Sequence, residues 1–92
     1  MAIQSTSELE AVISRVSIKL EKHIAERGTW PAMEDAKRTF DQARAVTRQA
    51  PKLKALREKL QGASESVASE LPLEGSLHED IWDIEDYLDY RL

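Results

Sequence analysis

The apolar residues of this chain recur at intervals of three and four positions, and this spacing constrains the fold more than any other feature. The first such stripe contains Leu9, Val12, Ile13, Val16, Leu20 and Ile24. A period of 3.6 residues places these side chains on one face of an α-helix. Ser5 and Ser7, each three residues before a glutamate, form capping-box patterns, and Gly28 is a typical residue after a helix end. The sequence therefore predicts a helix over about 6–27.

Two further stripes follow, with Pro51 between them. They contain Met33, Ala36, Phe40, Ala43, Thr47 and Ala50, and then Leu53, Leu56, Leu60, Ala63, Val67 and Leu71. The second is rotated by nearly half a turn relative to the first, which predicts separate helices over about 31–49 and 52–71. The junction before Pro51 lacks the Gly, Asn, Asp or Ser that tight turns favour. A single helix kinked at Pro51 is therefore an alternative.

The last stripe predicts a helix over about 76–90, after a loop at 72–75. Its members are Leu77, Ile81, Ile84, Leu88 and Leu92, and Ser76 with Glu79 forms a capping box before it. Four amphipathic helices with short connections predict one all-α domain, residues 1–92, folded as a small antiparallel bundle. The bundle would have three helices if the chain only kinks at Pro51.

Composition excludes several classes of protein. Ninety-two residues, 41% hydrophobic and 33% charged, suit one globular domain with a modest core. No run of about 18 apolar residues occurs, and the first ten residues lack the pattern of a signal peptide. Without cysteine there is no disulfide framework or thiolate metal site. We expect a cytoplasmic protein that does not enter a membrane.

The net charge of −4 is distributed unevenly along the chain. Residues 1–32 are neutral, residues 33–62 carry +4, and residues 63–92 carry −8. If the basic and acidic segments lie side by side, they neutralise each other through exposed pairs worth only about 0–1 kcal/mol each. If they lie on opposite faces, the acidic face is open to a partner.

The helix predicted at 76–90 combines carboxylates with aromatic rings away from its apolar stripe. These residues are Trp82, Asp83, Asp86, Tyr87, Asp89 and Tyr90. Trp and Tyr supply large rigid contact areas, and carboxylates pair with Arg and Lys. We therefore expect a small non-enzymatic regulator, inhibitor, antitoxin or immunity-type protein that presents this surface to a basic surface of another protein. The alternative is a solvated acidic face whose aromatic residues pad the core.

The basic segment supports a second hypothesis, in which a helical protein contacts nucleic-acid phosphates. The candidate residues are Arg38, Arg44, Arg48, Lys52 and Lys54. The negative net charge, the lack of interleaved aromatic residues and the missing turn glycine weigh against it. A third hypothesis is a structural subunit that forms a homodimer through the first helix. Ile18 is the large apolar residue opposite that helix's stripe, among Ala11, Ser14 and Ala25.

Nothing in the sequence indicates catalysis, so we expect no enzyme, no cofactor and no metal site. His23 lies at the edge of the first stripe, and His78 lies beside Glu79 near the start of the last helix. One His with acids at positions i+1 and i+5 is poor geometry for a metal site on a single helix. The paired Glu-x-x-His motifs of bundle metal sites and the glycine-rich phosphate loops are both absent.

Overall fold

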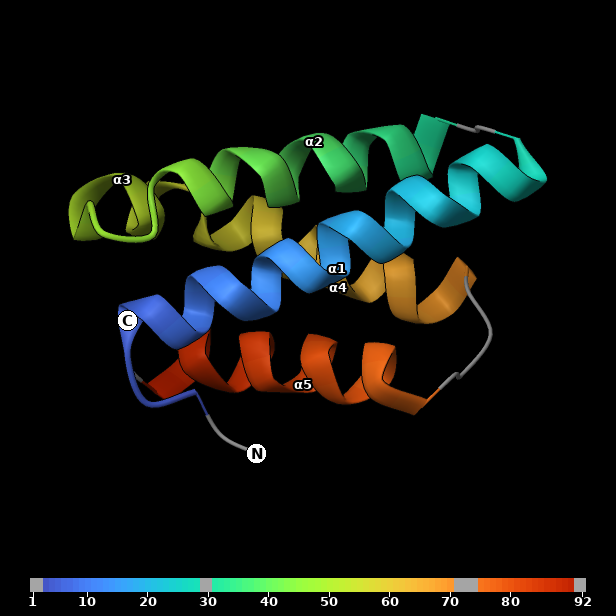
Figure 1. Cartoon of the computed structure of the whole chain (residues 1–92). Helices are drawn as coiled ribbons and strands as arrows, with labels where there is room; N and C mark the ends of the chain where they lie inside the picture. Colours follow the sequence, from blue (N-terminus) through green and yellow to red (C-terminus); the bar gives the residue numbers. More distant parts are fainter. Residues whose placement is uncertain (1–2, 29–30, 71–74, 91–92) are drawn as a thin grey trace.

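The computed structural model describes residues 3–28, 31–70 and 75–90. These residues form five α-helices: α1 (Thr6–Arg27), α2 (Pro31–Ala45), α3 (Ala50–Ala55), α4 (Arg57–Glu70) and α5 (Gly75–Tyr90). Helices α1 and α4 lie between α2 and α5, and the long helices that pack together run antiparallel (Figure 1). The prediction of an all-α antiparallel bundle is confirmed. In the described ranges, no helix is long and apolar enough to cross a membrane.

Helix α1 begins and ends as its sequence predicts. The Ser5 hydroxyl accepts the backbone N–H of Glu8 at 3.2 Å, and the Glu8 carboxylate accepts the backbone N–H of Gln4 at 2.9 Å. Gly28 has a φ of 83°, and its N–H donates to the carbonyl of Ile24 at 2.9 Å. A side chain rarely adopts that positive φ, so glycine suits this end.

The chain reverses direction between α2 and α3, so the alternative of one helix kinked at Pro51 is wrong. Helix α2 ends at Ala45, four residues before the predicted end, and α4 returns along it. Hydrogen bonds from Val46 N–H to the Ala43 carbonyl and from Gln49 N–H to the Val46 carbonyl, at 3.1 and 2.9 Å, shape the turn. No residue in it has a positive φ. Turns of this type accept most residue types, so the chain can reverse here without Gly, Asn, Asp or Ser.

The third predicted helix is present but is broken at Leu56. Pro51 lies in the first turn of α3, where its missing N–H leaves no hydrogen bond unmade. The Leu56 N–H donates to the carbonyl of Leu53 at 3.0 Å, which tightens the turn, and Leu60 N–H resumes the helical pattern to Leu56 at 2.8 Å. The stripe from Leu53 to Val67 continues across this break, so periodicity alone could not reveal it.

The core follows the four predicted stripes closely. Apart from Ile3, every described apolar side chain that is buried belongs to one of them. Thr47, predicted on the second stripe as helical, is buried in the turn after α2, whereas Ala50 on the same stripe is exposed. Helix α5 begins at Gly75, one residue before the prediction. The predicted loop at 72–74, Leu71, Leu92 and the Ser76 side chain lie outside what the structure describes.

Candidate partner-binding surface

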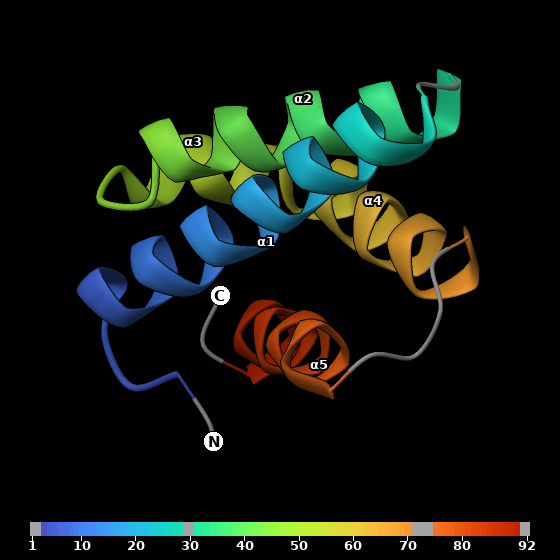
Figure 2. The same ribbon diagram turned by 45° about the vertical axis from the view of Figure 1, so that its right-hand side comes forward.

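Helix α5 forms one side of the bundle and packs on both α1 and α4 (Figure 2). Its inward side chains are Leu77, Ile81, Ile84 and Leu88, all buried as the stripe predicts. The acidic and aromatic residues around this stripe divide into three groups. One group faces α1, one faces α4, and one points away from the bundle.

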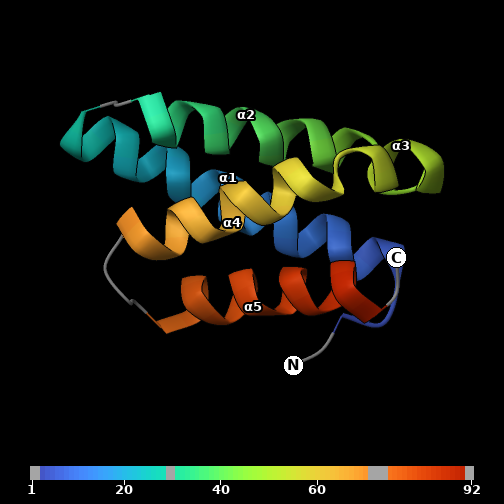
Figure 3. The ribbon, with the colours of Figure 1, turned by 180° about the vertical axis from the view of Figure 1, so that it is seen from behind.

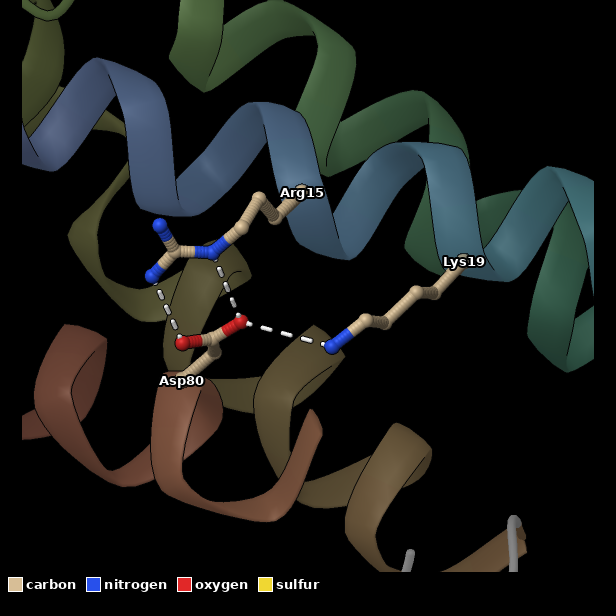
Figure 4. A network of polar contacts seen from close by, with 3 residues as sticks. All are labelled: Arg15, Lys19 and Asp80. Carbon is tan, nitrogen blue, oxygen red and sulfur yellow. Dashed lines mark hydrogen bonds and ion pairs between the residues drawn. The ribbon is translucent and has the colours of Figure 1, made fainter. Parts of the chain in front are cut away.

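Toward α1, Asp80 is buried and is held by two bases of that helix (Figure 4). Its carboxylate accepts Arg15 Nε at 3.2 Å and Nη2 at 2.9 Å, and Lys19 Nζ lies 3.7 Å from Oδ2. The hydrogen bond and the charge of Asp80 raise the pKa of Arg15 above its ordinary value. Asp80 is 5% exposed, so this carboxylate belongs to the α1–α5 interface and is closed to a partner.

This interaction was not among the predictions from sequence, although the sequence contains a signal for it. Asp80 lies three residues after Leu77 and four before Ile84, so it sits on the edge of the inward stripe. Arg15 and Lys19 are four residues apart and share a face of α1. Both patterns are visible in the sequence, but which helix lies beside α5 is not.

Toward α4, Asp89 is also engaged within the chain. Its Oδ1 accepts Gln61 Nε2 at 3.0 Å, and Arg57 Nη2 lies 3.5 Å away. Arg57 belongs to the basic segment, which therefore does reach part of the acidic helix. Asp89 is a predicted partner-binding residue that already has two contacts within the chain.

Two further predicted residues of α5 are half-buried. Tyr87 is half-buried and packs against the core. Asp83 is half-buried as well, and its charge contributes to the raised pKa of Arg15. Both side chains therefore take part in how α5 meets the rest of the bundle.

The outward face of α5 carries a ridge of residues spaced four apart. We call this row, His78, Trp82, Asp86 and Tyr90, the outer ridge. Trp82 is 55% exposed and Tyr90 is 84% exposed, and Asp86 lies exposed between them. The ring of His78 meets that of Trp82 edge-on, with centroids 4.3 Å apart and planes at 67°. Rows at this spacing are the ridges that fit into grooves of a neighbouring helix.

Negative charge accumulates beside the outer ridge on the α4 side. Burial, and then the charges of Glu65, Asp89 and Asp86, raise the pKa of Glu85 above its ordinary value, while His78 lowers it. The neighbouring carboxylates thus repel the carboxylate of Glu85 more than His78 stabilises it. A cation brought by a partner would relieve that repulsion.

The candidate nucleic-acid residues are scattered among acids. Arg38 lies 3.4 Å from Asp35, Arg48 lies 3.6 Å from Glu10, and Arg44 contributes charge beside Asp41. Lys52 and Lys54 are exposed on α3, without an ion pair to any described residue. These five side chains therefore do not form one uninterrupted basic surface.

The remaining candidates from the sequence lie on other faces. Ile18 is 62% exposed on α1, with Ala11 and Ala25 also exposed. His23 is half-buried, and its Nδ1 has no hydrogen-bond partner among the described residues. Within those residues, no group of three or more His, Asp or Glu side chains is placed to hold a metal ion.

Comparisons of the chain with protein-family models, with curated proteins and with solved structures gave no match.

Proposed function

We propose that this protein is a small protein-binding module whose outer ridge contacts a basic surface on another protein. The observation that carries the proposal is the exposure of Trp82 and Tyr90 on either side of Asp86. Folding accounts for Asp80, Asp89 and Tyr87 through contacts within the chain. It does not account for two large aromatic side chains in solvent.

The chemistry of the outer ridge favours a partner that presents arginine. A guanidinium group stacks on the face of an indole ring and pairs with a carboxylate through two hydrogen bonds. Asp86, one helical turn from both Trp82 and Tyr90, offers the carboxylate at the right place for this. A few residues dominate the binding energy of most protein interfaces, and Trp, Tyr and Arg are enriched among them.

The dimensions of the ridge suit a helix-sized contact. From His78 to Tyr90 it extends about 18 Å at 1.5 Å per residue. A specific interface buries about 800 Å² on each side, of which two exposed aromatic side chains supply a large part. A regulator or inhibitor of the antitoxin or immunity type, covering a basic functional surface of its target, fits this description.

Capture of partners from a lysate of the source organism tests the proposal. The immobilised protein is compared with Asp86→Lys and with Glu26→Lys, an equal charge change at an exposed position of α1. We expect the first variant to lose the captured protein and the second to keep it. Equal capture by both would contradict the proposal.

The contact can then be localised with the identified partner. In a Trp30→Phe background, Trp82 is the remaining tryptophan. Its emission should shift on binding, because the indole leaves water for an interface. An unchanged emission spectrum at saturation would place the contact elsewhere, for example on the basic residues of α2 and α3.

A further inference from the structure

A mainly apolar cleft lies at the α3 end of the bundle, and no residue of the outer ridge is among the described residues that line it. It has a volume of about 440 Å³ and is bounded by the start of α1, the turn after α2, α3 and the α5 residue Tyr87. This volume falls within the range of about 300–1,000 Å³ that small-molecule sites occupy. Leu53 is buried, and Pro51 and the half-buried Tyr87 add further apolar surface.

The fold explains why an opening exists here. Helix α3 has only six residues and ends at the break at Leu56. It is therefore a short separate helix that connects α2 to α4. In Figure 1 it lies at the end of the bundle where α1 begins and α5 ends. Small side chains such as Ala50 and Pro51 line this side, so the space is not filled from within the chain.

Among the described residues, the charged side chains of the cleft all have the same sign. Arg48 and Lys54 line it, and no described acidic residue does. Lys54 has no ion pair with a described residue. The contacts of Arg48 with described residues are long, 3.6 Å from its Nε to a Glu10 oxygen and 3.5 Å from its Nη2 to Ser7 Oγ, so the Arg48 side chain can turn toward a ligand. Charge-assisted bonds of full strength are about 2.7–2.9 Å long.

We propose that this cleft binds a small organic anion, with an apolar body against Leu53, Pro51 and Tyr87 and a carboxylate between Arg48 and Lys54. The guanidinium matches a carboxylate with two parallel hydrogen bonds, and the ammonium adds a point charge. An apolar pocket with a few convergent polar groups is the usual form of such sites. The proposal does not depend on the outer ridge, because Tyr87 is the residue of α5 that lines this cleft.

Titration with ten-carbon probes, below the concentration at which they form micelles, tests the site. Decanoate, decanol and decyltrimethylammonium share an apolar body and differ in head-group charge. We expect decanoate to shift the backbone amide resonances of Leu53, Lys54 and Tyr87 in a saturable way. Decanol and the cation should bind at least about tenfold more weakly, because each lacks the charged contact.

Substitutions inside and outside the cleft distinguish specific recognition of the anion from a general effect of the protein's net charge. Arg48→Glu with Lys54→Glu should weaken decanoate binding at least about tenfold. Lys52→Glu with Lys59→Glu makes the same charge change at exposed positions that do not line the cleft, and should retain it. Asp86→Lys on the outer ridge should also retain it. The proposal is overturned if decanoate gives no saturable shift, if decanol binds equally well, or if the first pair of substitutions has no effect.

Discussion

Helices α2 and α5 lie on opposite sides of the pair α1 and α4, and they pack against that pair in different ways (Figure 3). The buried face of α2 includes Ala36 and Ala43, which let its backbone approach α1 and α4 closely. The buried apolar residues of α5 are Leu and Ile, which hold its backbone farther away. The two helices thus bury similar stripes with different side-chain volumes.

Their outward faces differ as well. On α2, Lys37 pairs with Asp41 and Arg38 with Asp35, so opposite charges alternate within the helix. On α5, the described outward residues are acids and aromatic rings, and the basic partners come from other helices. A face neutralised by its own residues is explained by folding. A face of one charge with exposed aromatic rings is the better candidate for recognition.

Core substitutions should produce the largest effects, through a cavity on α5 and through overpacking on α2. Leu88→Ala on α5 leaves a cavity and should lower the free energy of unfolding by about 2–5 kcal/mol. Ala43→Leu on α2 overfills a close contact and should lower it by about 1–3 kcal/mol. Urea unfolding measures both, with Ala45→Leu as an exposed control on α2. If Ala43→Leu lowers the free energy of unfolding no more than Ala45→Leu does, the close approach of α2 does not depend on its buried alanines.

The Asp80 cluster should have the next largest effect. Asp80→Asn removes the charge that Arg15 and Lys19 share, and should lower the free energy of unfolding by about 1–3 kcal/mol. Glu79→Gln, at the exposed neighbouring position, should change it by less than about 0.5 kcal/mol. Equal effects of the two substitutions in urea unfolding would show that the ion pairs of the buried Asp80 do not fix α5 against α1.

Asp41 on α2 should contribute to stability in a pH-dependent way. Burial raises its pKa, but hydrogen bonds from Ser17 and Lys37 and the charges of Lys37 and Arg44 outweigh this, and the pKa is lowered. Its contribution is therefore present above the unfolded pKa of about 4 and is lost as pH falls through the lower folded pKa.

Asp41→Asn tests that contribution. It should lower stability at pH 7 by about 1 kcal/mol or less, because the side chain is partly exposed, and should flatten the loss of stability below about pH 4. Urea midpoints measured from neutral to acidic pH check this, with Asp35→Asn as the exposed control. A curve parallel to that of the unsubstituted protein would contradict it.

Glu85 on α5 should show a small effect of the opposite sign. Its pKa is raised first by burial and then by neighbouring carboxylates, so the ionised form destabilises the fold. Stability should therefore rise as pH falls through the raised folded pKa toward the unfolded value. Glu85→Gln should stabilise the protein by a few tenths of a kcal/mol at pH 7, the size of a like-charge pair on a helix. A destabilised variant in thermal unfolding would show that the repulsion between Glu85 and its neighbouring carboxylates is compensated.

Most of the fold follows from the sequence because the apolar stripes and the caps act locally. Ser5 and Gly28 mark the ends of α1 as predicted, and the stripes identify nearly all of the buried apolar residues. The sequence alone does not distinguish the reversal after Ala45 from a kink, because i→i+3 turns without positive φ need no special residue. The break at Leu56 was missed because the apolar stripe continues across it.

The candidate surface was predictable only in outline. The sequence identifies α5 as acidic and aromatic, but it does not reveal that Arg15 and Lys19 reach Asp80 or that Gln61 and Arg57 reach Asp89. Those contacts depend on which helices are neighbours, and periodicity within a helix contains no information about that.

The central claim is that the outer ridge serves binding and not folding. The most direct measurement combines Trp82→Ala and Tyr90→Ala in one double variant. Its affinity for the partner and its free energy of unfolding are compared with those of the unsubstituted protein. We predict that affinity for the captured partner falls by about 30-fold or more, while stability changes by less than about 0.5 kcal/mol per site. Unchanged affinity, or a loss of stability large enough to explain the loss of binding, would contradict the claim.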